Sequence, residues 1–416
     1  MSSEEEVGLG PGEVDDGGPS TGGEDESPLD YMGRLNLERQ EGVLPDHLLA
    51  RAVRAGYVDA GRFSMVAENI QPASLDLRLG ETAFRIRASF LPGRDSVQEK
   101  LKEFALHEFD IRKDGAMLEA GQPYLVELKE RLHLPKGLRG RTNPKSSTGR
   151  VDVFTRVITD GSDRFDEIVP GYEGGLYLEV VPLSFAVRVR EDLTLNQLRL
   201  TMGRATLTDR EILAAHAEEP LLYRTGKALR PEDLLLSDGL FLGLDLRGDE
   251  RRRVGYSARD HAPLLDLTRE RDLDPEPFWE PVMREDGNRI ILSPRRFYLL
   301  MSNESVSIPP NMAAEMTAYD PTSGELRTHY AGFFDPGFGF DPDGSFHGSR
   351  AALEVRAHEV PFVIEHGQAV CKLRFERMIA RPAVLYGAEI GSSYQRQEET
   401  LSRFFRRSGP SSTDRT

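Results

Sequence analysis

Hydrophobic and polar residues alternate along much of the first half of the chain, and this pattern predicts β-strands. In residues 74–79 and 82–90 apolar side chains recur at every second position, which places them on one face of a strand. The same pattern continues in residues 123–128, 186–190 and 197–200. Each such strand buries one face, so we predict a mainly β fold built from short antiparallel strands.

Two stretches show helical spacing instead. Residues 42–55 place Leu44, Leu48 and Leu49 on one face, close to an N-terminal Pro-Asp signal. Residues 207–217 show similar spacing and lead into a charged, proline-containing stretch. We expect a short helix before the β region and a second one in a linker between the two halves.

The second half of the chain repeats landmarks of the first. Glu179, in a β-prone run, is matched by Glu354, and the turn residue Gly149 is matched by Gly324, both at an offset of 175 residues. A repeat at a fixed offset favours tandem duplication of one β domain, and chance similarity between two β domains is the alternative. The predicted organisation is an acidic disordered tail at 1–40, a first β domain at 41–205, a helical linker at 206–235, a second β domain at 236–407 and a disordered tail at 408–416.

Composition narrows the classes of function. The chain has 53 Lys and Arg against 69 Asp and Glu, for a net charge of −16, which disfavours a broad nucleic-acid surface but permits a local basic pocket. No apolar run approaches the ~18 residues of a membrane span, and the acidic N-terminus has no apolar signal core. One cysteine, Cys371, excludes an intrachain disulfide framework and fits a reducing compartment. We therefore expect a cytoplasmic protein without nucleic-acid or membrane partners.

The stretch from Asn143 to Val181 holds the candidate chemistry. Residues 145–150 (KSSTGR) gather two cations and three hydroxyls around a glycine, a turn that can bind phosphate through backbone N–H groups, hydroxyls and charge. Further along, Glu179 lies inside an apolar run, where a carboxylate is costly to bury unless something pairs with it. Together they indicate an anionic ligand at one end and a working carboxylate at the other.

Four motifs, in this order, resemble the dCTP deaminase branch of the dUTPase superfamily. They are PASLDLRLG at 72–80, KSSTGR at 145–150, PGYEG at 170–174 and LYLEV at 176–180. The tail at 386–397, with Tyr386, Tyr394 and Gln397, is similar to the C-terminal lid of that branch, although Ser393 stands where a lysine is usual. The resemblance implies two tandem dUTPase-like, distorted β-barrel (jelly-roll-like) domains with a few short helices. It also implies a homo-oligomer, because family members assemble as trimers with sites at subunit interfaces.

By this resemblance, the expected function is hydrolytic deamination of dCTP to dUTP and ammonia, which supplies dUTP for dUMP and dTMP synthesis. Zinc-dependent nucleobase deaminases need at least two thiolates, and Cys371 is the only one, so we expect no zinc and a carboxylate that activates water. Mg2+ is expected with the substrate triphosphate, and no metal ligand set is expected in the protein. Two alternatives stay open: a bifunctional dCTP deaminase and dUTP diphosphatase that gives dUMP, or a non-catalytic nucleotide-sensing protein on the same fold. The sequence also leaves open whether dTTP binds as a feedback ligand.

The resemblance assigns roles to individual residues. Glu179 is the candidate general base, with Arg150 and Ser146 as further catalytic residues, and a structural ion pair of Glu179 with an arginine is the alternative. Substrate binding is expected from Lys145, Ser147, Thr148, Gly149, Tyr172, Tyr177, Leu178, Tyr386, Tyr394 and Gln397. Asp76 and Arg78 are expected to form a structural pair.

The two halves depart from the family pattern at different positions. Many superfamily members have an acidic residue before the Pro-Gly-aromatic turn, where it helps to hold the sugar; the first half has Val169 there, and the second half keeps Asp335. The second half, however, has Glu325 where the first has Arg150, and a carboxylate there repels phosphate. We therefore interpret the second half as a supplier of an interface and the lid, and the first half as the catalytic one.

Overall fold

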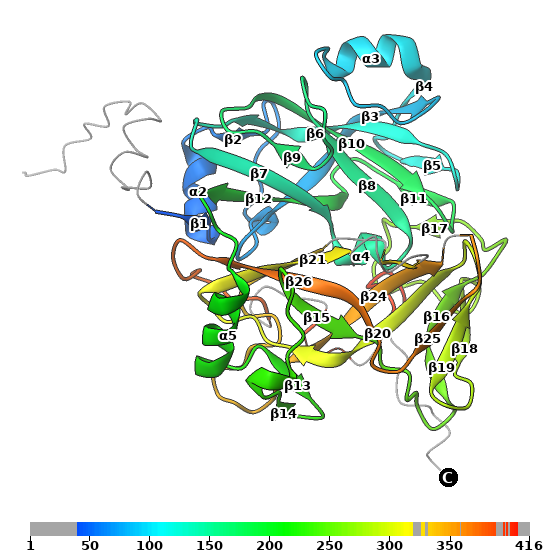
Figure 1. Cartoon of the computed structure of the whole chain (residues 1–416). Coiled ribbons are helices and arrows are strands. Elements are labelled where there is room, and N and C mark those ends of the chain that lie inside the picture. Colours follow the sequence, from blue (N-terminus) through cyan, green and yellow to red (C-terminus); the bar gives the residue numbers. More distant parts are fainter. Residues whose placement is uncertain are drawn as a thin grey trace, which may run out of the picture.

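The computed structural model describes residues 40–318, 326–328, 332–357, 359–387, 394–395, 397 and 400–406. Two β-rich domains lie one above the other in Figure 1, the first coloured from blue to green and the second from green to orange. The mainly β fold predicted from the alternating pattern is confirmed. The predicted terminal tails, apart from residue 40, lie outside the described residues.

Short helices accompany the strands of both domains. The helix predicted in residues 42–55 runs over Asp46–Arg54 (α2), and the one predicted in 207–217 runs over Asp209–Glu218 (α5). Helix α5 begins with a capping box, in which Thr208 and Glu211 satisfy each other's backbone N–H groups. The other helical elements are α3 (Val97–Phe104), α4 (Ser146–Gly149) and the 3-10 turns η2 (Ala67–Asn69) and η3 (Pro231–Asp233).

The first domain has twelve described strands, ten of which form a largely closed, barrel-like sheet. They are β1 (Gly42–Val43), β2 (Val58–Asp59), β3 (Leu75–Ile86), β4 (Ala105–Asp110), β5 (Ala116–Leu118), β6 (Tyr124–His133), β7 (Leu138–Pro144), β8 (Val153–Ile158), β9 (Glu167–Ile168), β10 (Glu173–Pro182), β11 (Val187–Val189) and β12 (Thr194–Met202). The main path of the sheet is β8-β10-β6-β3-β12-β7-β9, and its neighbours are antiparallel. Leu75, Leu77 and Leu79 of the first alternating stretch are buried in its core, as the pattern predicts.

The second domain is divided among smaller sheets. Its strands are β13 (Leu222–Arg224), β14 (Lys227–Ala228), β15 (Leu240–Gly243), β16 (Arg253–Ala258), β17 (Leu265–Asp266), β18 (Trp279–Met283), β19 (Arg289–Leu292), β20 (Phe297–Val306), β21 (Met312–Ala318), β22 (Leu326–Thr328), β23 (Gly332–Phe334), β24 (Ser349–Ala357), β25 (Phe362–Glu365) and β26 (Ala369–Arg377). One sheet follows β14-β13-β20-β16-β18 with β24 on β20 and β22 on β24, another follows β15-β26-β21-β23, and β19 pairs with β25.

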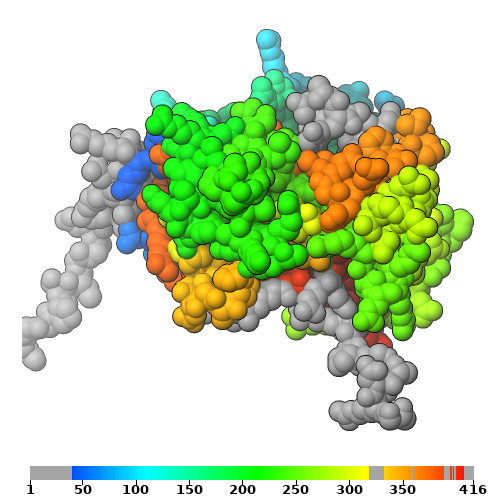
Figure 2. Space-filling model, turned by 60° about the horizontal axis from the view of Figure 1, so that its bottom comes forward, coloured from blue at the N-terminus to red at the C-terminus, as the bar shows by residue number. Residues whose placement is uncertain are grey.

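The segment between the two halves packs on the second domain. Ile212 of α5 and Leu221, which follows it, are buried in the core of that domain. In Figure 2 this segment forms a broad green surface over the lower face of the molecule. Residues 206–235 therefore belong structurally to the second domain, although they precede its first long strand.

Segments from the second half also cross into the first domain. Strand β17 pairs in parallel with β11, and Phe278 and Trp279 pack their rings against Phe185 of the first core. At the end of the described chain, Phe405 contacts the rings of both Phe278 and Trp279. The first core therefore depends on residues far along the sequence, and this brings the C-terminal segment back to α4.

Buried charges join the facing surfaces of the two domains. Arg199 of β12 is almost fully buried and donates to Asp335 at 2.9 Å, to Glu376 at 2.8 Å and to the carbonyl of Ala314 at 3.1 Å. Asn143 of β7 donates to a Glu315 carboxylate oxygen at 2.9 Å. Buried ionised groups require such pairing, so the two domains can meet here in one relative position.

Candidate active site

A cavity of about 390 Å³ lies between the two domains and receives residues from both. From the first domain come the turn at α4 and parts of β3 and β12; from the second come β23, β24 and the C-terminal segment. In Figure 1, α4 lies on the side of the first domain that faces β24 of the second domain. The site therefore depends on both halves, whereas the sequence analysis assigned catalysis to the first half alone.

The wall from the first domain is the KSSTGR turn. Lys145, Ser146, Ser147 and Arg150 line the cavity, so the structure brings these four predicted residues together. Thr148 and Gly149 are buried behind them in α4 and do not line it. The turn thus presents two cations and two hydroxyls to one space, as a phosphate-binding turn requires.

Lys145, at the start of this turn, is held by Asp76, which was expected to pair with Arg78. Its Nζ pairs with Asp76 Oδ2 and donates to Thr194 Oγ1 at 3.0 Å. Arg78 donates to Glu130 at 2.7 Å, so the expected pair of Asp76 with Arg78 is wrong. On a strand, side chains two positions apart share a face but need not touch. Here Arg78 pairs with Glu130 on the neighbouring strand β6, and Asp76 pairs with Lys145 at the start of α4.

Arg150 connects the turn to the C-terminal segment. It is 2% exposed, and its Nε donates to Ser146 Oγ at 3.1 Å. Its Nη1 donates to the carbonyl of Thr400 at 3.2 Å, and its guanidinium lies 3.7 Å from the ring centroid of Tyr394. Tyr394 and Gln397, both predicted lid residues, line the cavity together with Tyr386. Within the described residues the tail therefore closes over the turn of the first domain.

The wall from the second domain carries a buried carboxylate, Glu354 of β24. Burial raises the pKa of Glu354 to about 7, and the positive charge of Arg150 acts in the opposite direction. Asp335, which follows β23, also lines the cavity; burial raises its pKa, while Arg199 and Ser74 stabilise its charged form. A carboxyl with a pKa near neutral pH can both accept and return a proton.

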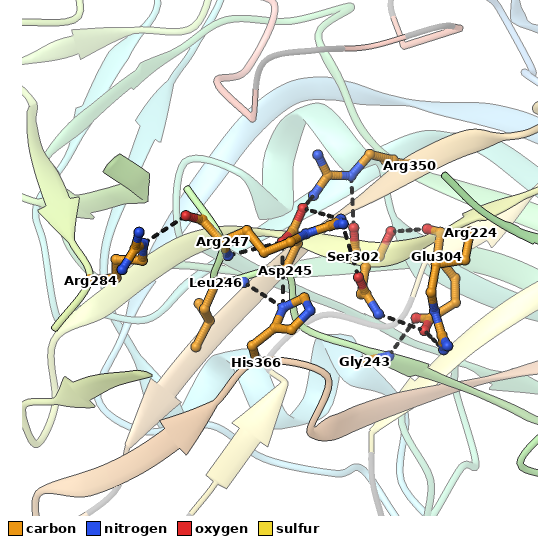
Figure 3. Close-up of polar contacts among 11 residues, drawn as sticks. Arg224, Gly243, Asp245, Leu246, Arg247, Arg284, Ser302, Glu304, Arg350 and His366 are labelled. Atoms are coloured by element: carbon orange, nitrogen blue, oxygen red, sulfur yellow. Dashed lines mark hydrogen bonds and ion pairs between the residues drawn. The ribbon is translucent and has the colours of Figure 1, made fainter. Parts of the chain in front are cut away.

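A polar network of the second domain fixes the start of β24 (Figure 3). Arg350 donates from Nε to the carbonyl of Ser302 at 2.8 Å and from Nη2 to Asp245 Oδ2 at 2.8 Å. Asp245 also accepts from Arg247 Nε at 2.9 Å. Arg350 lies four residues before Glu354 on the same strand, and its carbonyl accepts a hydrogen bond from Gln397. The network therefore holds both the strand of the carboxylate and one contact of the tail.

Glu179 lies in a different environment from Glu354. It is fully buried on β10 and accepts from Arg156, with Oε1 at 3.1 Å from Nε and at 2.6 Å from Nη2. Arg156 in turn stacks over Phe165 at 3.7 Å. Glu179 does not line the cavity: its Oε1 pairs with Arg156, as in the structural ion pair left open as the alternative, and its Oε2 is buried without a hydrogen-bond partner among the described residues.

Three further predicted residues lie outside the cavity with Glu179. The hydroxyl of Tyr172 donates to the carbonyl of Gly175 at 2.7 Å, inside the first domain. The hydroxyl of Tyr177 accepts from Gln98 at 3.4 Å, and Leu178 is part of the first core. All three lie in β10 or next to it, and like Glu179 on the same strand they do not line the cavity.

Several cavity residues were not predicted as site residues. The charged residues among them include Asp76, Asp335, Glu354 and Arg403. The repeat offset does point to Glu354, because it links that residue to Glu179. Sequence spacing carries no information on which of two equivalent carboxylates meets the turn, since that depends on how the domains pack.

The two β domains enclose a cation- and hydroxyl-lined cavity with a buried carboxylate, an arrangement suited to nucleotide chemistry. Residues 40–204 match the family model of the 2'-deoxycytidine 5'-triphosphate deaminase (DCD) N-terminal domain, and residues 208–405 match that of the C-terminal domain. The chain therefore belongs to the dCTP deaminase family. Membership supports an enzyme over the non-catalytic sensor that the sequence left open.

Individual relatives show the same likeness. A "dCTP deaminase, dUMP-forming" from Halobacterium salinarum is 30% identical over 196 residues, which cover 46% of this chain and 90% of the relative. A "dCTP deaminase" from Haloarcula marismortui is 29% identical over 138 residues, 32% of this chain and 66% of the relative. The crystal structure of 2'-deoxycytidine 5'-triphosphate deaminase from Agrobacterium tumefaciens matches with a TM-score of 0.78 and 44% identity, covering 85% of this chain and all of that one. No helix in the described residues is long and apolar enough to cross a membrane.

Proposed function

We propose that the chain hydrolyses dCTP to dUTP and ammonia in the cavity between its domains, with Glu354 as the general base. The observation that carries this proposal is the juxtaposition of Glu354, with a pKa raised to about 7, and the KSSTGR turn in one cavity. Glu179 does not line this cavity. We therefore transfer the role expected of Glu179 to its counterpart in the second half.

The reaction is a substitution at C4 of the cytosine base. Glu354 accepts a proton from water as the water oxygen bonds to C4, which gives a tetrahedral intermediate. The same carboxyl then donates a proton to the amino nitrogen, the C4–N bond breaks and ammonia leaves. Water supplies the new oxygen and two protons: one leaves with the amino nitrogen as ammonia, and the other ends on ring nitrogen N3, so dCTP plus water gives dUTP plus ammonia.

Arg150 and Ser146 support this step from the first domain. The charge of Arg150 favours the ionised form of Glu354, which is the form that accepts a proton from water. Ser146 accepts a hydrogen bond from Arg150 and so has its own hydroxyl hydrogen free to orient toward a water or substrate oxygen. Arg150 is held in place because it is buried and also contacts the carbonyl of Thr400 and the ring of Tyr394. Its hydrogen bond to Ser146 in turn orients the serine hydroxyl.

The triphosphate is proposed to lie along Lys145 and Ser147, with Mg2+ bound to the phosphates. The described residues contain no group of three His, Cys, Asp or Glu that could hold a metal ion alone. One oxygen fits a shared ion: Asp76 Oδ1 is buried and has no hydrogen-bond partner among the described residues, while Oδ2 accepts from Lys145. A carboxylate oxygen is a hard ligand that suits Mg2+, which would supply charge neutralisation at the triphosphate.

The formation of dUMP is the second candidate outcome. Several curated relatives are named as dUMP-forming, and the cavity contains a second buried carboxylate, Asp335. Asp335, however, already accepts from Arg199 at 2.9 Å and from Ser74 at 3.2 Å. These bonds favour a role in holding the sugar over one as a base in phosphate hydrolysis.

The experiment that tests the function is product analysis of dCTP incubated with the full-length chain and Mg2+. Ammonia is measured with a coupled dehydrogenase, and nucleotides are separated by anion-exchange chromatography. Equal amounts of ammonia and dUTP are expected. Ammonia with dUMP and pyrophosphate would indicate the bifunctional reaction, and absence of ammonia would contradict the proposal. The homo-oligomer, the cytoplasmic location and dTTP as a feedback ligand stay predictions from the sequence.

A further inference from the structure

We propose that Arg403 is a third cation of the anion-binding part of the cavity and that it exchanges an ion pair with Glu270 for a phosphate group of the substrate. The inference rests on the proposed function for the identity of the nucleotide. It goes beyond the motif residues, because Arg403 lies outside all the motifs by which the sequence was interpreted.

The backbone of Arg403 is anchored on both sides in the first domain. Leu401, Phe404 and Phe405 are buried in the core of that domain, although they come from the end of the chain. Burial of such side chains is strongly favourable, so the short segment between them has little freedom. Arg403 is thus presented to the cavity by a fixed scaffold.

Direct hydrogen bonds attach this segment to the KSSTGR turn. Ser402 Oγ donates to the carbonyl of Ser147 at 2.8 Å, and the backbone N–H of Arg403 donates to the hydroxyl of Tyr394 at 3.2 Å. The ring of Tyr394 carries the guanidinium of Arg150 on its face. Arg403 and Arg150 are therefore connected through one tyrosine, and both line the same cavity.

The guanidinium of Arg403 has an ion pair that water and a competing anion can disrupt. Its Nη2 lies 3.1 Å from Glu270 Oε1, and the side chain of Glu270 is 55% exposed. Exposed pairs of this kind contribute little to stability because water screens them. Among the described residues, the Nε of Arg403 is buried and has no hydrogen-bond partner.

The charges of the cavity explain why a third cation is needed. Among the described residues that line it, the carboxylates are Glu68, Asp76, Asp335 and Glu354, and the cations are Lys145, Arg150 and Arg403. Lys145 is paired with Asp76, and Arg150 is engaged by the tail and lies in the field of Glu354. Arg403 is the lining cation whose partner, Glu270, lies outside the cavity. It is therefore the one that a phosphate group can recruit without leaving a carboxylate unpaired inside.

The test compares Arg403→Gln with Arg406→Gln in the full chain. Arg406 is on the same segment, is 64% exposed, pairs with Asp272 and does not line the cavity. Calorimetric binding is measured with inorganic tripolyphosphate, with deoxycytidine, and with dCTP in a Glu354→Gln background that prevents turnover. Arg403→Gln is expected to weaken tripolyphosphate and dCTP by about tenfold to a hundredfold and to leave deoxycytidine unchanged, because a charge-assisted hydrogen bond is lost.

Two further variants separate charge from folding. Arg403→Lys keeps the charge but not the planar fork, so intermediate affinity for tripolyphosphate is expected. Glu270→Gln removes the competitor of the phosphate, so tighter binding of tripolyphosphate is expected. Unchanged anion binding in Arg403→Gln, or equal losses of deoxycytidine and dCTP, would overturn the proposal. Because tripolyphosphate needs no turnover, this result stands even if the wild-type chain releases no ammonia from dCTP.

Discussion

Glu354 of the second domain and Arg150 of the first line one cavity, and the charge of Arg150 opposes the effect of burial on the Glu354 carboxyl. In the first half, the counterpart of Glu354 pairs with Arg156 instead of lying beside Arg150 in the cavity. The pair exists only when the domains are packed together. This relationship leads to the predictions that follow.

The first prediction concerns the pH dependence of turnover. A general base works in its ionised form, and burial raises the pKa of Glu354 to about 7. The rate constant kcat/KM for dCTP is therefore expected to rise with pH, to reach half of its maximum near pH 7 and to level off above that pH. The measurement is a pH–rate profile of the wild type between pH 5 and 9. An acid limb centred near pH 4.5, the ordinary range of a glutamate, would contradict the assignment.

The second prediction concerns stability, and its sign follows from the same pKa. A carboxyl whose folded pKa is raised binds its proton more tightly in the folded state, so stability is lost as pH rises from about 4.5 through 7. Glu354→Gln is therefore expected to raise the free energy of unfolding at pH 8 relative to the wild type, by an amount on the order of 3 kcal/mol at most. At pH 4 the difference is expected to vanish. Urea denaturation at both pH values measures it, and a destabilised variant at pH 8 would refute this reasoning.

A third prediction concerns the ion pairs between the domains. Arg199→Met leaves Asp335 and Glu376 without their common partner in a buried place, which costs about 3–5 kcal/mol. The exposed pair of Arg164 with Glu167 supplies the control, since Arg164→Met is expected to change stability by less than ~1 kcal/mol. Denaturant unfolding followed by intrinsic fluorescence measures both. Equal effects of the two substitutions would show that Arg199 does not hold the domains together.

A fourth prediction concerns the C-terminal segment. Phe405 is buried against Phe278 and Trp279, so Phe405→Ala is expected to lower the free energy of unfolding by about 3–5 kcal/mol. It is also expected to raise KM for dCTP, because the segment that holds Ser402 against the KSSTGR turn is loosened. Arg406→Ala, next to it and exposed, is the matched control and is expected to leave both quantities near the wild-type values. Loss of stability without a change in KM would separate the segment from the site.

Much of the fold could be predicted from local pattern. The alternation in residues 74–79 indicates which side chains of this stretch enter the apolar core, and the spacing in 42–55 indicates α2, because a strand and a helix each repeat over a few residues. The crossing of Phe405 into the first core has no such signal. It joins residues that are far apart in sequence, and an aromatic side chain does not specify which core it enters.

The position of the active-site carboxylate could not be predicted from local pattern either. Glu179 and Glu354 occupy equivalent places in the repeat, and each is opposite a leucine on one neighbouring strand, Leu125 on β6 and Leu299 on β20. On its other side Glu179 is opposite Arg156 on β8. Arg156 is thus a cross-strand neighbour that pairs with Glu179, whereas burial raises the pKa of Glu354. That neighbour depends on strand register, and the approach of Arg150 depends on domain packing. Neither can be derived from the spacing of motifs within one half.

The most direct test of the central claim is ammonia release from dCTP by Glu354→Gln beside Glu179→Gln, at a temperature where both variants are shown to be folded. Glu354→Gln is expected to lose at least ~100-fold in kcat, because the proton acceptor is gone. Glu179→Gln breaks the pair with Arg156 and is expected to lower stability while keeping kcat within a few-fold of the wild type. The reverse result, with activity lost in Glu179→Gln and retained in Glu354→Gln, would contradict an active site formed between the two domains.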